Sequence, residues 1–123
     1  MPIIHPGDAT TFPAHGSTFS SFVSPRRGSE QLCAWKLSVP AGQVGVAHRP
    51  SNEEVLLILD GRLQVTIDGD RGFVGPGDVV LIPAGASVTI DGTTVDASAW
   101  VTTTRGLRAT LENGEMIAPP WAQ

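Results

Sequence analysis

The stretch GQVGVAHRPSNEEVLLILDG, residues 42–61, carries the clearest pattern in the chain. Alternation of apolar residues predicts a strand that places Val44, Val46 and His48 on one face. Glu54 then opens a second apolar run, and Pro50 stands between the two polar residues. A histidine and a carboxylate at the ends of neighbouring strands are therefore the first candidates for chemistry.

Short runs rich in valine, isoleucine, leucine and threonine lie between 14 glycines and 10 prolines, and no convincing helical stripe interrupts them. This pattern predicts an all-β fold, an antiparallel sandwich or barrel. One predicted strand places Cys33, Trp35, Leu37 and Val39 on a common face. Asp60–Gly61 is expected to form a tight hairpin turn. The expected strands fall in residues 32–40, 43–48, 54–60, 62–69, 77–85 with 87–92 as a bent pair, and 95–106.

The spacing of glycines, prolines and polar residues resembles the cupin family. That family's first motif reads G-x5-H-x-H-x3-4-E-x6-G. Gly42, His48, Glu54 and Gly61 stand at matching positions, and Pro50 replaces the second histidine.

The second cupin motif reads G-x5-P-x-G-x2-H-x3-N. Gly77, Pro83 and Gly85 match it, whereas Val88 and Gly92 replace the histidine and the asparagine. The resemblance implies a single jelly-roll barrel domain over residues 1–123, with its core motifs in 32–104. Residues 1–31 and 105–123 would be extensions packed on the barrel, and Trp121 would pack the tail across a surface or a partner subunit.

A resident metal is not expected. In the family both motif residues and two further histidines bind one metal, and here only His48 and Glu54 remain. Metal enzymes of this kind use three or more protein ligands. A divalent ion at these two residues would be held weakly unless His5 or His15 completed the site.

His48 and Glu54 are predicted to face each other inside an apolar barrel and to pair by a hydrogen bond or ion pair. Such a pair can act as a general acid–base couple. Three hypotheses stay open: metal-independent proton transfer of the isomerase, cyclase or lyase type on a hydrophobic or aromatic molecule; a divalent-metal enzyme such as a dioxygenase; or a non-catalytic ligand-binding module. The predicted ligand-lining residues are Cys33, Trp35, Val46, Pro50, Val88 and Trp100.

Charge and composition restrict the partners. The net charge of −4, a single lysine and the absence of a basic run argue against nucleic acid and anionic membrane. Cys33 is the only cysteine and no signal peptide is visible, so a cytoplasmic protein is expected. The four apolar residues of 56–59 in succession suggest that both strand faces are covered, which predicts a homodimer.

Overall fold

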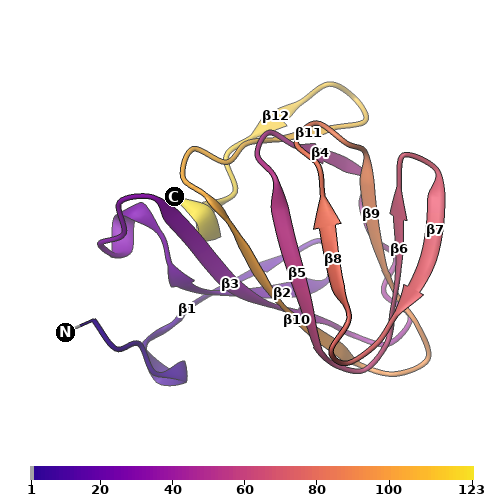
Figure 1. Cartoon of the computed structure of the whole chain (residues 1–123), viewed down its shortest axis with the longest axis horizontal. Coiled ribbons are helices and arrows are strands. Elements are labelled where there is room, and N and C mark those ends of the chain that lie inside the picture. The colour runs from indigo at the N-terminus through magenta and orange to yellow at the C-terminus, as the bar shows by residue number, and fades with distance from the viewer. Residues whose placement is uncertain (1) are drawn as a thin grey trace.

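A computed structural model describes residues 2–123. Its strands form two antiparallel six-stranded sheets that face each other as a sandwich (Figure 1). The predicted all-β jelly-roll architecture is thereby confirmed. Helical structure in residues 2–123 is limited to the 3-10 turns η1 (Pro6–Asp8), η2 (Pro25–Arg27) and η3 (Pro120–Ala122). None of the helices in this range has the length and apolarity that crossing a membrane requires.

The first sheet has the strand order β1-β2-β3-β10-β5-β8. Its strands are β1 (Thr10–Ala14), β2 (Ser17–Val23), β3 (Leu32–Val39), β10 (Ala97–Thr104), β5 (Glu54–Asp60) and β8 (Val79–Ile82). The predicted alternation along β3 is confirmed, because Cys33, Trp35, Leu37 and Val39 are all buried in the core. β1 and β2 were not expected from the sequence. Their mixture of threonine, serine and phenylalanine gives only a weak apolar alternation.

The second sheet has the strand order β12-β11-β4-β9-β6-β7. Its strands are β12 (Met116–Ile117), β11 (Ala109–Leu111), β4 (His48–Pro50), β9 (Val88–Gly92), β6 (Leu63–Ile67) and β7 (Asp70–Val74). β4 is short, and β11 and β12 extend this sheet with residues that follow the predicted core.

Two predicted strand pairs are wrong in the same way. β5 and β6 do not pair across Asp60–Gly61, because β5 belongs to the first sheet and β6 to the second. β8 and β9 likewise lie in different sheets, so Pro83–Gly85 is a crossing between layers. Gly61 has a φ of +74°, and a Cβ there would collide with the backbone of Asp96 and Ala97. The turn is therefore a tight corner of the sandwich, and alternation alone does not say which strands share a sheet.

The predicted strand over residues 43–48 is also wrong, because β4 begins only at His48. The preceding segment is held by loop contacts. Gly45 donates its N–H to the Asp91 side chain at 2.8 Å, and a Cβ on Gly45 would collide with the Ile90 carbonyl. Irregular backbone leaves Val44 73% exposed, so it does not share an inward face with His48.

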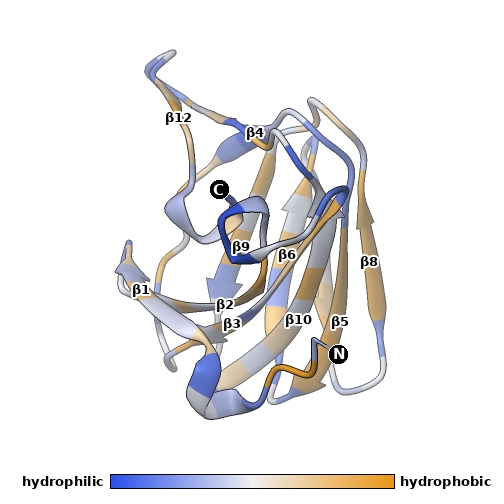
Figure 2. Ribbon diagram, turned by 90° about the vertical axis from the view of Figure 1, so that its left-hand side faces the viewer, coloured by the Kyte–Doolittle hydropathy of each residue, from blue (hydrophilic) through white to orange (hydrophobic). Residues whose placement is uncertain are grey.

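An apolar surface covers part of the outside of the first sheet, over β5 and β8. β5 and β8 lie side by side at one edge and are coloured orange over most of their length in Figure 2. Their outward side chains are exposed although they are apolar: Val55, Leu57, Leu59, Val79 and Leu81. We call these five residues the outer apolar face.

Candidate functional site

A cavity opens between the two sheets at one end of the sandwich. Strands of both sheets, the tip of the β1–β2 hairpin and the C-terminal tail form its walls. The cavity has a volume of about 110 Å³ and is open to solvent at its mouth. The walls are mainly apolar, and few ionisable side chains border the space, which is the usual composition of a ligand pocket.

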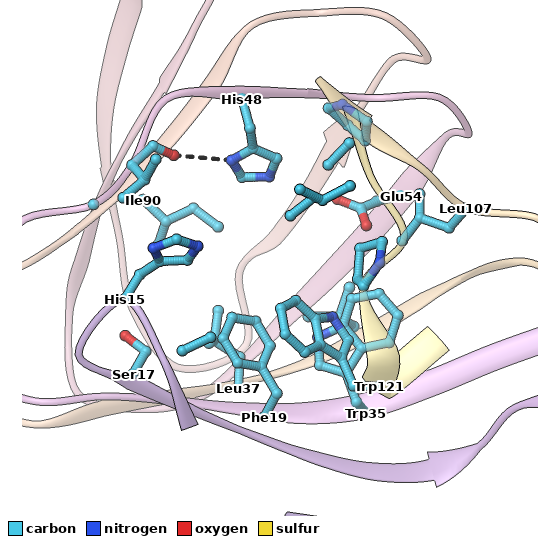
Figure 3. Close-up of a pocket in the computed structure, with 18 of the residues that line it drawn as sticks. His15, Ser17, Phe19, Trp35, Leu37, His48, Glu54, Ile90, Leu107 and Trp121 are labelled. Carbon is cyan, nitrogen blue, oxygen red and sulfur yellow. Dashed lines mark hydrogen bonds between the residues drawn. The ribbon is translucent and has the colours of Figure 1, made fainter. Parts of the chain in front are cut away.

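Aromatic side chains form one wall of the cavity. The Phe19 and Trp121 rings stack with centroids 3.7 Å apart and planes 12° apart. Trp35 meets Trp121 edge to face with centroids 6.5 Å apart. Figure 3 shows the three rings together, across the cavity from His48. Flat aromatic walls of this kind suit a planar ligand.

The C-terminal tail is fastened into this wall. Ser21 donates its hydroxyl to the Trp121 carbonyl at 2.7 Å, and the Cys33 thiol contacts the Ala122 carbonyl at 3.4 Å. Trp121 is only 8% exposed. The tail therefore packs inside its own chain and completes the cavity, rather than lying across an outer surface through Trp121.

Glu54, the first residue of β5, is a buried carboxyl group that borders the cavity. It is 7% exposed and has no hydrogen-bond partner among residues 2–123. Because burial penalises the charged form, it raises the pKa of Glu54 from 4.5 to about 7. Glu54 is therefore partly protonated near neutral pH and can donate or accept a proton there.

His48, at the start of β4, is half-buried and turns its ring into the cavity. Nδ1 lies 2.9 Å from the Val46 carbonyl, as the dashed line in Figure 3 shows. A carbonyl oxygen only accepts, so Nδ1 carries the hydrogen and Nε2 keeps a lone pair. Burial lowers the pKa of His48 below 6.5, the Val46 bond opposes this, and charge on His15 lowers the pKa further. His48 is therefore a neutral base at neutral pH.

The predicted hydrogen bond or ion pair between His48 and Glu54 is wrong. The backbone carbonyl of Val46, two residues before His48, takes the bond that orients the imidazole. Glu54 stays unpaired among residues 2–123, and desolvation alone shifts its pKa. The two groups border the same cavity as an independent base and an independent acid.

Three of the predicted ligand-lining residues, Trp35, Val46 and Pro50, border the cavity. Cys33 and Val88, which were expected there, lie behind its walls with 0% exposure. Burial raises the pKa of the Cys33 thiol, although Arg105 opposes the shift, so Cys33 is a poor nucleophile.

Trp100 does not line the cavity either. Its neighbours Ala99 and Val101 on β10 are buried inward, so alternation turns Trp100 to the outside of the first sheet. There it meets Phe22 edge to face with centroids 5.3 Å apart. Sequence alone did not show which face of β10 points inward, because both faces carry apolar residues.

Phe19, Leu107 and Trp121 border the cavity but were not predicted there, and His15, which also borders it, was considered only as a possible metal ligand. They come from the two extensions, outside the motifs on which the site prediction rested. One signal was available, since His15–Gly16 is a turn-like pair between two runs that contain threonine and phenylalanine, residues 10–14 and 17–23.

The metal that cupin motifs imply does not fit these residues. Pro50 and Val88 stand at two ligand positions, and neither side chain carries a donor atom. No group of three or more histidine, cysteine, aspartate or glutamate side chains in residues 2–123 is arranged to hold a metal ion. His15 borders the cavity, whereas His5 is exposed beside η1 and does not.

The chain belongs to the cupin domain family, whose pattern matches residues 35–99. Its fold is similar to the polyketide cyclase RemF from Streptomyces resistomycificus, with a TM-score of 0.74 at 18% identity over 85% of this chain and 79% of that chain. It is also similar to the DMSP lyase DddQ from Ruegeria pomeroyi, with a TM-score of 0.65 at 28% identity over 71% of this chain and 46% of that chain. No curated protein matches the chain.

A third similar structure is salicylate 1,2-dioxygenase from Pseudoaminobacter salicylatoxidans. The TM-score is 0.72 at 15% identity, over 84% of this chain and 31% of that chain. These neighbours carry different activities on one fold, so the fold itself does not select a reaction.

Proposed function

We propose that this cupin binds a neutral, planar aromatic small molecule and catalyses proton transfer on it without a resident metal. The observation that carries the proposal is the placement of a neutral imidazole and a protonatable carboxyl group in one apolar cavity. A base and an acid that are both uncharged suit a neutral ligand, because neither adds a buried charge that the ligand must compensate.

The chemistry that follows is proton abstraction next to a carbonyl. Nε2 of His48 takes a proton from the carbon beside the carbonyl, and the Glu54 carboxylic acid gives its proton to the carbonyl oxygen. The product is a neutral enol, with an imidazolium and a carboxylate left on the protein. In an isomerisation, His48 returns its proton to a different carbon and the enol proton goes back to Glu54. In a cyclisation, the enol carbon attacks a second carbonyl, the enol proton goes back to Glu54, and the His48 imidazolium protonates the new alkoxide.

The substrate class rests on the cavity walls. The Phe19, Trp35 and Trp121 rings all border the cavity, and an aromatic ligand can pack against them. Cyclisation of a polyketide, the activity of the similarly folded RemF, belongs to the same reaction type, which supports this class as an analogy.

The proposal predicts that the reaction rate falls at both low and high pH. Glu54 must be protonated, so the rate falls as pH rises through about 7. His48 must be neutral, so the rate also falls as pH drops below its pKa, which lies under 6.5. Glu54→Gln removes the titrating acid, and the alkaline limb of the profile is expected to flatten.

Deuterium exchange tests the reaction class without the natural substrate. 2-Tetralone, a neutral bicyclic ketone, is incubated with protein in D₂O, and exchange beside its carbonyl is followed by NMR. His48→Ala is expected to slow protein-dependent exchange by about 100-fold or more, the usual contribution of general acid–base catalysis. Glu53→Gln is the matched control for Glu54→Gln, because Glu53 precedes Glu54 but is exposed. It is expected to exchange at the wild-type rate.

Two outcomes would contradict the proposal. Calorimetric binding of 2-tetralone without exchange above buffer would favour the non-catalytic ligand-binding module. Loss of exchange after dialysis against EDTA, with recovery on adding a divalent ion, would favour the metal-dependent alternative. The donor set gives that alternative no support, and the exchange rate is expected to survive EDTA unchanged.

A further inference from the structure

Two hairpins of this chain share an uncommon backbone feature. His15 and Asp68 are the only residues in 2–123 other than glycine with a positive φ, at +53° and +48°. Each precedes a glycine that also has a positive φ, Gly16 in the β1–β2 hairpin and Gly69 in the β6–β7 hairpin. Positive φ at both central residues is the mark of a type I′ turn, in which Asn-Gly and Asp-Gly are preferred.

The requirements of a type I′ turn explain why an aspartate stands at position 68, but they do not explain the histidine at position 15. The Asp68 carboxylate accepts the Ser87 N–H at 2.9 Å, and the Asp68 N–H donates to the Ser87 carbonyl at 2.9 Å. Histidine followed by glycine is not among the residue pairs that I′ turns prefer. The His15 ring borders the cavity.

The tip of the His15 hairpin packs against the side chain of Gln43. Gly16 lies so close to Gln43 that an added Cβ would collide with the amide of that side chain. Gln43 is itself held, because its backbone exchanges hydrogen bonds with Pro40 and Gly92 at 3.1 and 2.7 Å. The tip of the hairpin is therefore placed against the loop that leads into β4, which begins at His48.

His15 and Glu54 border different parts of the cavity. His15 is exposed and lies beside Ser17, whereas Glu54 is buried and lies near Leu107 on the other side of Figure 3. His48 lies between them and points toward the same space. Burial is the main cause of the lowered pKa of His48, and charge on His15 adds to it, as expected for two rings that share a cavity.

We propose that His15 is a ligand-binding residue that hydrogen-bonds a second polar group of the ligand, at the solvent end of the cavity. The inference rests on the proposed function, and it adds that the aromatic ligand carries oxygen at both ends. One oxygen meets the acid at the buried end, and the other meets the imidazole at the mouth. The contact between the His15 ring and the ligand would then explain why a residue other than glycine occupies this strained, positive-φ position.

Paired naphthols test the inference. Calorimetry measures the binding of 2-naphthol, with one hydroxyl, and of 2,6-dihydroxynaphthalene, with hydroxyls at opposite ends. Wild-type protein is expected to prefer the diol. His15→Asn is expected to weaken diol binding by about 5- to 10-fold, the range for loss of one hydrogen bond, and to leave 2-naphthol unchanged.

The variant is chosen so that the fold survives. Asn-Gly is a preferred I′ pair, so His15→Asn is expected to unfold at the wild-type temperature or above it. Asp68→Asn is the matched control, since it introduces the same Asn-Gly pair at a hairpin that does not border the cavity. It is expected to bind both naphthols like wild type. His15→Gly repeats the test with the other residue that tolerates positive φ.

Three outcomes would contradict the proposed role of His15. Unchanged affinity of His15→Asn for both naphthols would overturn the role of His15 and leave the proposed function standing. Equal weakening for both would show that His15 contributes shape rather than a polar contact, which also overturns it. Failure of wild type to bind either naphthol would refute the aromatic ligand class, and the inference would fall with it.

Discussion

The two ends of the sandwich interior differ, although the same strands build both. At one end Ile58 and Leu63 are 0–1% exposed and lie in the core without bordering the cavity. At the other end the same layers leave a cavity that Glu54 and His48 border. β5 reaches both ends, since Glu54 faces the cavity and Ile58 faces the closed core. We call these regions the packed end and the open end.

The difference shows how stability and function are divided. The packed end buries aliphatic side chains with no polar group to satisfy, which is the main favourable contribution to folding. The open end keeps a carboxyl group and an indole N–H buried without partners in residues 2–123. Groups of that kind destabilise the folded state, so the packed end must offset them.

Replacing one leucine at each end with alanine is expected to give the largest difference in the free energy of unfolding. Leu63→Ala at the packed end is expected to lower the free energy of unfolding by about 2–5 kcal/mol, because the side chain leaves a closed cavity. Leu37 borders the open cavity, so Leu37→Ala is expected to cost about 1–2 kcal/mol. Urea denaturation measures both. Equal losses would show that the two ends are packed alike.

The comparison also indicates what the sequence could predict. The alternation of β3 and the glycine and proline positions gave the fold class and placed Trp35, His48 and Glu54 near one cavity. Pairing across the two sheets was not predictable from those patterns, because a corner at Asp60–Gly61 and a hairpin at His15–Gly16 use similar turn residues.

The rest of the site depends on contacts distant in sequence. Trp121 reaches Phe19 across about a hundred residues, and no local pattern indicates that stack. The orientation of His48 depends on a backbone carbonyl, which every residue has. Such features depend on how distant segments are placed in the fold and not on residue types, so they cannot be predicted from the sequence pattern.

The outer apolar face offers a smaller test, confined to the surface. Leu57 and Leu81, two of its five residues, are 38% and 54% exposed, and we propose that a second copy of the chain covers this face in a homodimer. Leu57→Glu is expected to yield the monomer mass by light scattering at micromolar concentration. Protomer stability should change by no more than about 0.5 kcal/mol, as for surface substitutions.

A matched change elsewhere controls for the added charge. Leu32 is 52% exposed and lies on β3, outside the outer apolar face, so Leu32→Glu is expected to remain a dimer. Both variants should bind aromatic ligands like wild type, because neither side chain borders the cavity. A wild-type monomer, or a dimer that survives Leu57→Glu, would refute this interface.

The raised pKa of Glu54, at the open end, makes the stability of the folded protein depend on pH. Its folded-state pKa of about 7 lies above the ordinary 4.5, so the folded state holds the proton more tightly than the unfolded state. The resulting stability is complete below pH 4.5 and is lost as pH rises through 7, to a total of about 3 kcal/mol. Glu54→Gln is expected to remove this component from the pH dependence of unfolding.

The most direct test of the acid at the open end is an NMR titration of the Glu54 side-chain carboxyl carbon. The proposed chemistry requires this group to hold its proton near neutral pH, inside a cavity that it shares with a neutral His48. A midpoint of about 7, absent from the spectrum of Glu54→Gln, is the result expected. A midpoint near the ordinary 4.5 would show that the carboxylate is charged and solvated, and the acid–base account of this cavity would be wrong.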